Sequence, residues 1–126
     1  MLSYLLLFVG SAAVALWGVM HLVKTKAVVA GFEPLTDDNR HVLRMEWIVE
    51  GVALVFVAAL VGVTTGLSGR TADSSGIVYG MSAAFLLAMA VVSLFTGARA
   101  SPLPYKLCAP IFASAAILIL VGAFLV

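Results

Sequence analysis

Four long apolar stretches account for most of the chain, and they cover residues 2–23, 45–67, 77–98 and 108–126. A membrane-spanning helix needs roughly 20 mostly apolar residues, because the hydrocarbon core is about 30 Å thick and each residue rises about 1.5 Å. The first stretch lacks the basic start of a signal peptide and exceeds its apolar run of about 7–15 residues, so we expect it to be retained. The pattern predicts an all-α fold in which residues 1–126 form a single transmembrane domain, a bundle of four antiparallel helices.

Composition narrows the class of protein further. Hydrophobic residues make up 63% of the chain and charged residues 10%, with a mean hydropathy of +1.19. Soluble domains carry about 25% charged residues, so this composition excludes a soluble enzyme or a disordered chain. The net charge of +1 gives no basic surface for a nucleic acid. The expected partner is the lipid bilayer, and no nucleic acid is expected.

Basic residues in the connections predict the orientation. Counted along four antiparallel helices, the first and third connections share one side of the membrane. That side holds Lys24, Lys26, Arg40, Arg44, Arg99 and Lys106, whereas the other side holds only Arg70. The positive-inside rule therefore predicts a multi-pass plasma-membrane protein with connections one and three in the cytoplasm and both termini outside.

The first connection also contains a helix start. Thr36 precedes Asp37, Asp38 and Asn39, which places a capping hydroxyl before carboxylates that the positive end of a helix dipole favours. We expect the second helix to begin near Asp37 and to continue into the 45–67 span.

Small residues repeat every fourth position in two rows. Such rows let membrane helices approach closely, and they predict close packing at Ala58, Gly62 and Gly66 and at Gly76, Gly80, Ala84 and Ala88. Whether the partner helix belongs to the same chain or to a second copy stays open, so a homo-oligomer is one alternative.

Ionisable groups inside the spans converge toward the cytoplasmic side. At about 100° per residue, Glu46 and Glu50 share a face of the second helix. His21 lies on one stripe of the first helix with Gly10, Val14, Trp17 and Thr25, and a polar interior forms if these stripes face inward. We take Glu50, Glu46 and His21 as candidate catalytic residues, because ionisable groups in a membrane are costly and mark functional sites. The structural alternative is a buried ion pair or hydrogen bond from Glu50 to His21 or Arg99 that only fixes helix register.

Further side chains of the same half are candidates for ligand binding: Trp17, Trp47, Ser93, Arg99 and Tyr105. The aromatic ones fit an interfacial belt equally well. No metal site is predicted, because His41 lies off the carboxylate face and no dense ligand spacing occurs. Cys108 is interpreted as a small packing residue, and no motif identifies a cofactor.

Residues 21–60 carry a family resemblance. A connection containing Gly31-Phe32 leads to a helix in which Glu50 precedes the small residues Gly51 and Ala53. With the four-span layout, this stretch resembles the broad DoxX-like group of small four-helix membrane proteins. The resemblance covers about a third of the chain and implies the four-helix fold. Members of the group are associated with quinone-linked or thiol redox partnerships.

Two main functional hypotheses follow from these residues. The first is a membrane protein with a cytoplasm-facing polar pocket that binds a small amphiphile, such as a quinone or terpenoid, and transforms it by proton transfer if it is an enzyme. The second is a proton- or cation-coupled small-molecule transporter that uses Glu50. A structural subunit of a larger membrane complex is a third alternative.

Overall fold

A computed structural model describes residues 1–97 and 106–125, and this part of the chain contains helices and no strands. The helices are α1 (Leu2–Ala30), α2 (Asp37–Val63) with the π-helical turn η1 (Thr64–Ser68), α3 (Asp73–Thr96) and α4 (Cys108–Phe124). Three helices are long and apolar enough to cross a membrane: α1, α2 continued through η1, and α3. The apolar α4 is shorter, with 17 residues, although 108–126 is expected to form a full span.

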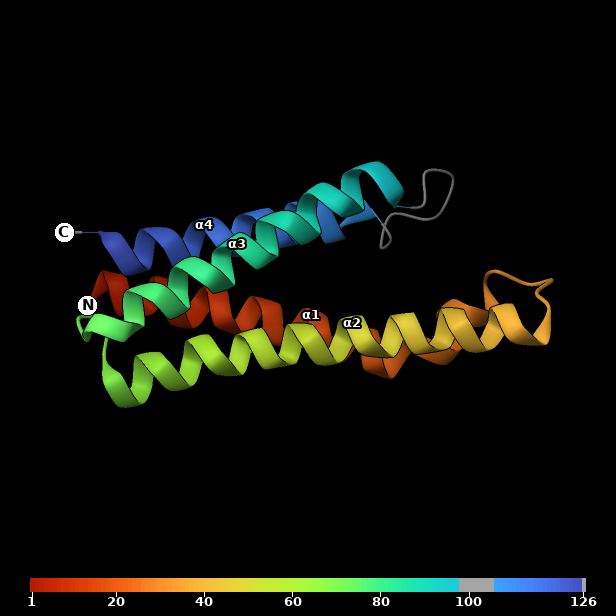
Figure 1. Ribbon diagram of the computed structural model, residues 1–126, viewed down its shortest axis with the longest axis horizontal. Coiled ribbons are helices and arrows are strands. Elements are labelled where there is room, and N and C mark those ends of the chain that lie inside the picture. Colours follow the sequence, from red (N-terminus) through yellow and green to blue (C-terminus); the bar gives the residue numbers. More distant parts are fainter. Residues whose placement is uncertain (98–105, 126) are drawn as a thin grey trace.

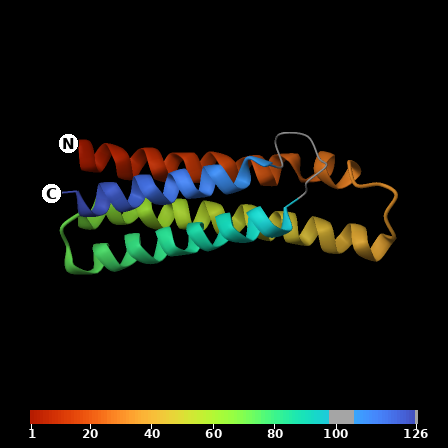
Figure 2. The same ribbon diagram turned by 90° about the horizontal axis from the view of Figure 1, so that it is seen from above.

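The helices lie side by side along their lengths (Figure 1). α1 contacts both α2 and α4, and α3 packs mainly on α4. The N and C labels mark the same end of the molecule. At the opposite end, α1 and α2 continue well past the ends of α3 and α4, as the second view also shows (Figure 2).

Helix lengths explain this overhang. With 29 residues α1 is about 43 Å long, whereas the 17 residues of α4 give about 26 Å. A hydrocarbon core is about 30 Å thick, so α1 is longer than a membrane crossing requires and α4 is slightly shorter. His21 lies 19 residues, or about 29 Å, from the start of α1, close to the level at which α4 begins.

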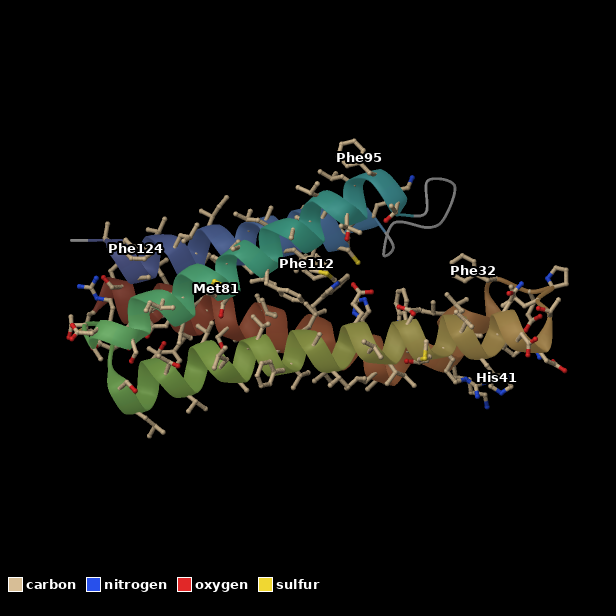
Figure 3. The ribbon with its side chains drawn as sticks, in the orientation of Figure 1. Phe32, His41, Met81, Phe95, Phe112 and Phe124 are labelled. Carbon is tan, nitrogen blue, oxygen red and sulfur yellow. The ribbon has the colours of Figure 1, made fainter. Side chains whose placement is uncertain are left out.

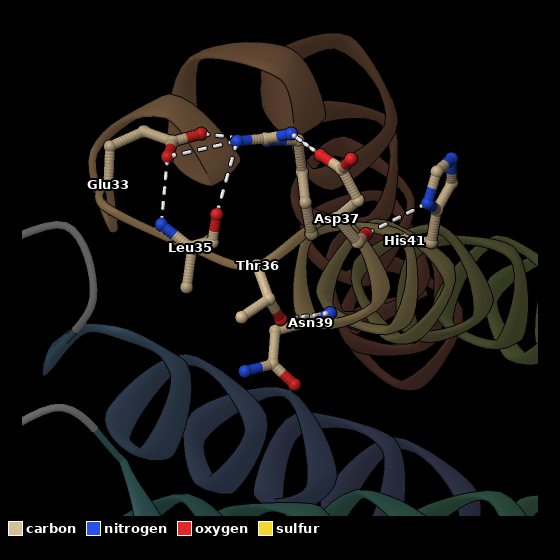
Figure 4. Close-up of polar contacts among 7 residues, drawn as sticks. Glu33, Leu35, Thr36, Asp37, Asn39 and His41 are labelled. Atoms are coloured by element: carbon tan, nitrogen blue, oxygen red, sulfur yellow. Dashed lines mark hydrogen bonds and ion pairs between the residues drawn. The ribbon is translucent and has the colours of Figure 1, made fainter.

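Polar contacts close the connection between α1 and α2 (Figure 4). The Thr36 hydroxyl accepts a hydrogen bond from the Asn39 amide at 3.2 Å, and α2 begins at Asp37, where the sequence predicts it. The Arg40 guanidinium donates to the Glu33 carboxylate at 2.8 and 3.2 Å and to Asp37 at 2.6 Å. The Arg40 hydrogen bonds are the main cause that lowers the pKa of Glu33 below its usual value.

Glycines set the closest approaches between helices. A Cβ built on Gly18 would lie 2.9 Å from the carbonyl oxygen of Gly51, and one built on Gly51 would lie 3.0 Å from that of Gly18. On its other side α1 meets α4, where a Cβ on Gly10 would lie 3.3 Å from the Ala115 carbonyl oxygen. Backbones can approach this closely only without side chains between them.

The expected small-residue packing on α3 is not found within the described chain. A Cβ on Gly80 would meet nothing within 4 Å, and Ala84 and Ala88 are exposed. In the row predicted on the second helix, Ala58 is buried and a Cβ on Gly62 would lie 3.2 Å from the Ser11 hydroxyl, whereas one on Gly66 would also meet nothing. α3 turns a different face inward, because its larger residues Tyr79 and Leu86 fill the core. A four-residue repeat shows that close packing is feasible, but it does not show which face a helix buries.

At the end of the bundle that carries both termini, the Arg70 side chain bonds to the C-terminus of α4. The Arg70 guanidinium donates to the carbonyls of Ala123 and Leu125 at 3.1 and 2.7 Å, which satisfies acceptors at the C-terminus of α4. Between this end and His21 the interior is mostly apolar, with a few buried hydroxyl groups such as those of Ser11, Thr65 and Ser82. Phe112, labelled in Figure 3, lies between the α1–α2 and α3–α4 pairs and is fully buried, as are Leu7, Val14, Leu54, Val61 and Leu86.

Candidate functional site

His21 is a buried polar side chain near the end of the four-helix part that lies opposite the termini. It is 3% exposed, and its Nδ1 lies 2.9 Å from the carbonyl oxygen of Trp17, one turn earlier in α1. A carbonyl only accepts, so Nδ1 carries a proton and donates it. The Thr25 hydroxyl donates to the His21 carbonyl at 2.7 Å. These contacts fix the ring and leave Nε2 directed away from its own helix.

Glu50 of α2 faces this free edge of the imidazole. Its Oε1 lies 3.5 Å from His21 Nε2, and its side chain is 25% exposed. This N···O distance exceeds the 2.7–3.2 Å range of an N–H···O hydrogen bond, but it lies within ion-pair range. Two acceptor atoms would repel each other at this distance, so a proton or another cation between Nε2 and the carboxylate is required for a stable contact.

Both tryptophans of the chain contact the His21 ring. Trp47 stacks on it, with ring centroids 4.4 Å apart and planes at 23°, and Trp17 meets it edge-on at 5.8 Å. Both tryptophan side chains are half-buried. Their apolar rings shield the imidazole from water, which strengthens the electrostatic interaction between His21 and Glu50.

A third ionisable residue, Cys108, completes the cluster. It is the first residue of α4 and half-buried. Its Sγ, one carboxylate oxygen of Glu50 and one ring nitrogen of His21 all lie within 4.8 Å of one another. We call these three residues the His–Glu–Cys cluster. From the sequence alone, Cys108 is expected to be a small packing residue, since nothing in its local sequence shows that the start of α4 reaches this level of α1 and α2.

The rotation of α2 separates the two candidate glutamates. Its buried residues are Gly51, Leu54, Val57, Ala58 and Val61. The sequence instead predicts an inward face that has Glu46 and Glu50 at its middle. At about 100° per residue, Glu50 lies about 45° from the centre of the buried stripe and Glu46 about 85°. Glu46 is accordingly exposed. The Gly18–Gly51 contact explains this rotation, because it turns Gly51 rather than the glutamates toward α1.

Of the remaining candidates, the structure describes Ser93 and His41, and neither belongs to the His–Glu–Cys cluster. Ser93 is half-buried on α3, and within residues 1–97 and 106–125 no hydrogen bond joins its side chain to His21 or Glu50. His41 is exposed and contacts the Asp37 carbonyl at 2.9 Å; Figure 3 shows it near the overhanging end of α2. Arg99 and Tyr105 lie outside the described residues.

The chain was compared with family models, with curated proteins and with solved structures, and none of them matches it. The cluster must therefore be interpreted from its own geometry. A shielded imidazole, a partly exposed carboxylate and a thiol can exchange protons, take up a cation or do both in turn.

Proposed function

We propose that the protein is a four-helix membrane protein that binds a small amphiphile, such as a quinone or terpenoid, and exchanges a proton with it through Glu50 and His21. The observation that carries this proposal is the 3.5 Å contact between the buried His21 Nε2 and the partly exposed Glu50 carboxylate. In the proposed orientation the bundle is antiparallel, both termini lie outside, and the site opens toward the cytoplasm.

The two residues have complementary roles in this proposal. Glu50 is 25% exposed, so it can exchange a proton with water or with a hydroxyl or carbonyl group of the ligand. His21 cannot reach water as easily, but its ring holds the proton that the carboxylate gives up. Trp17 and Trp47 supply flat apolar surfaces beside the pair, which suits a ligand with a planar ring. Membership of the DoxX-like group stays a prediction.

Intrinsic fluorescence tests ligand binding directly, because both tryptophans of the chain contact His21. The purified protein in lipid nanodiscs is titrated with a short-chain quinone, which quenches a tryptophan that it contacts. We expect saturable quenching. Glu50→Gln keeps the shape of the side chain but removes its charge, so it should weaken quinone binding by about 10-fold or more, the effect of losing one hydrogen bond to a charged group.

Glu46→Gln is the matched control, since it makes the same chemical change on the same helix at an exposed position. It should bind the quinone like the unmodified protein. Equal quenching curves for the Glu50 and Glu46 variants would contradict the proposal. The alternative, a proton-coupled transporter, is tested in reconstituted lipid vesicles. A quinone-driven proton flux across their membrane that disappears in Glu50→Gln would favour it.

A further inference from the structure

We infer that the His–Glu–Cys cluster is a binding site for a divalent transition metal ion of borderline softness, with Zn²⁺ as the ion that fits best. The cluster offers one imidazole nitrogen, one carboxylate oxygen and one thiolate sulfur, from His21, Glu50 and Cys108. Zinc binds all three donor types, and a hard ion such as Mg²⁺ avoids sulfur.

The distances are close to those of a zinc site. Imidazole nitrogen and carboxylate oxygen lie about 2.0–2.2 Å from zinc, so two such ligands at a tetrahedral angle are about 3.4 Å apart. The distance from His21 Nε2 to Glu50 Oε1 is 3.5 Å. Sulfur should lie about 3.6 Å from each of the other two donors, and all three atoms are already within 4.8 Å of one another. The sulfur of Cys108 therefore has to move by about 1.2 Å at most to complete the geometry.

The orientation of His21 is an independent argument. A metal-bound histidine almost always donates its other ring N–H to a carbonyl or carboxylate, which fixes the tautomer and directs the free lone pair to the metal. Here Nδ1 donates to the Trp17 carbonyl at 2.9 Å. The other ring nitrogen, Nε2, is buried and has no hydrogen-bond partner among the described residues. It is directed at Glu50 and Cys108, so its lone pair is available to a cation.

Three protein ligands leave a fourth position for water or for an oxygen of a bound molecule, which is the arrangement of catalytic rather than structural zinc sites. Glu50 is partly exposed, and this gives an ion and a fourth ligand a route to the site. The metal would replace the proton between His21 and Glu50. The inference therefore concerns the same side chains as the proposed function, but it does not depend on the amphiphile.

Metal binding is tested on the full chain in nanodiscs after treatment with a chelator. Calorimetric titration with Zn²⁺ should show one site per chain, and Co²⁺ should give a thiolate-to-metal charge-transfer band. Cys108→Ser should abolish the band. It should also weaken Zn²⁺ binding by more than about 100-fold, because loss of a hydrogen bond to a metal ligand alone costs about 10- to 100-fold. Glu50→Gln should also weaken binding, while Glu46→Gln and His41→Gln leave it unchanged.

Circular dichroism shows whether each variant keeps its helices, and Glu50→Gln decides the question if Cys108→Ser fails to fold. Absence of Zn²⁺ binding to the unmodified chain, or equal Zn²⁺ affinity in the Cys108, Glu50 and Glu46 variants, would overturn the inference. Zn²⁺ binding and quinone quenching are separate measurements. Failure of the first alone refutes the metal site, and failure of the second alone refutes the proposed function.

Discussion

The Gly18–Gly51 contact gives the sharpest test of the helix arrangement. In Gly18→Ala the new methyl group would lie 2.9 Å from the Gly51 carbonyl oxygen and 3.0 Å from the Leu54 Cβ. Ordinary contacts begin at 3.4 Å, so α1 and α2 must separate by about 0.5 Å. These two atoms belong to the backbone and to a Cβ, so they cannot move aside by a side-chain rotation; a third, the Cγ2 of Val55 at 3.0 Å, can. Overpacking of this kind costs about 1–3 kcal/mol.

The matched control is Gly80→Ala on α3, where the added Cβ meets no atom within 4 Å. Both variants gain up to about 1 kcal/mol from replacing glycine by alanine in a helix. The difference between the two variants therefore isolates the overpacking cost, and Gly18→Ala should be about 1–3 kcal/mol less stable than Gly80→Ala. Reversible unfolding in mixed micelles, followed by circular dichroism, measures this difference.

The same substitution should affect the site. His21 lies one turn beyond Gly18, and Glu50 directly precedes Gly51, so a separation of the helices lengthens the 3.5 Å contact between them. Gly18→Ala should therefore weaken quinone quenching, whereas Gly80→Ala leaves it unchanged. Equal stability of the two variants, with equal quenching, would refute the close contact between α1 and α2.

Three further predictions concern other parts of the molecule. The carboxyl group of Glu33 should titrate below its usual value of 4.5, so its contribution to stability is present above that pH and is lost as the pH falls through the lowered pKa. Carbon-13 NMR titration measures this, and an unchanged pKa in Arg40→Gln would contradict the Arg40 contact as its cause. Tyr79→Phe removes the buried 3.0 Å hydrogen bond to Thr65 and should cost about 1 kcal/mol in micelle unfolding; a neutral effect would argue against this bond. Free Zn²⁺ at 100 times its dissociation constant should stabilise the unmodified chain by about 2.7 kcal/mol, and an equal gain in Cys108→Ser would show that the ion binds elsewhere.

Local signals in the sequence were sufficient for the parts of the fold that depend on neighbouring residues. The hydroxyl of Thr36 and the carboxylates after it determine the start of α2. The apolar runs predict four spans, and three of them form helices long enough for a membrane. His21 is identified as an inward residue of α1, because its stripe of small and apolar neighbours repeats at helical spacing.

Contacts between helices could not be derived in the same way. A helical projection places Glu46 and Glu50 on the same face. Only the close approach at Gly18 and Gly51 shows that Glu46 is exposed and Glu50 faces His21. Cys108 joins the cluster because α4 begins at the level of His21. That level depends on how α4 lies along α1, and no pattern within either helix encodes it.

The overhang of α1 and α2 makes the two routes to the cluster unequal. Toward the termini, about 29 Å of helix packed around Leu7, Val14 and Leu54 separates His21 from the end of the bundle. Toward the overhang, α1 and α2 are the only helices of the described chain that continue beyond the level of Cys108, and the Glu50 side chain stays 25% exposed. In the proposed function, protons and ions would therefore reach the cluster from the overhang, and the longer packed half would separate it from the opposite compartment.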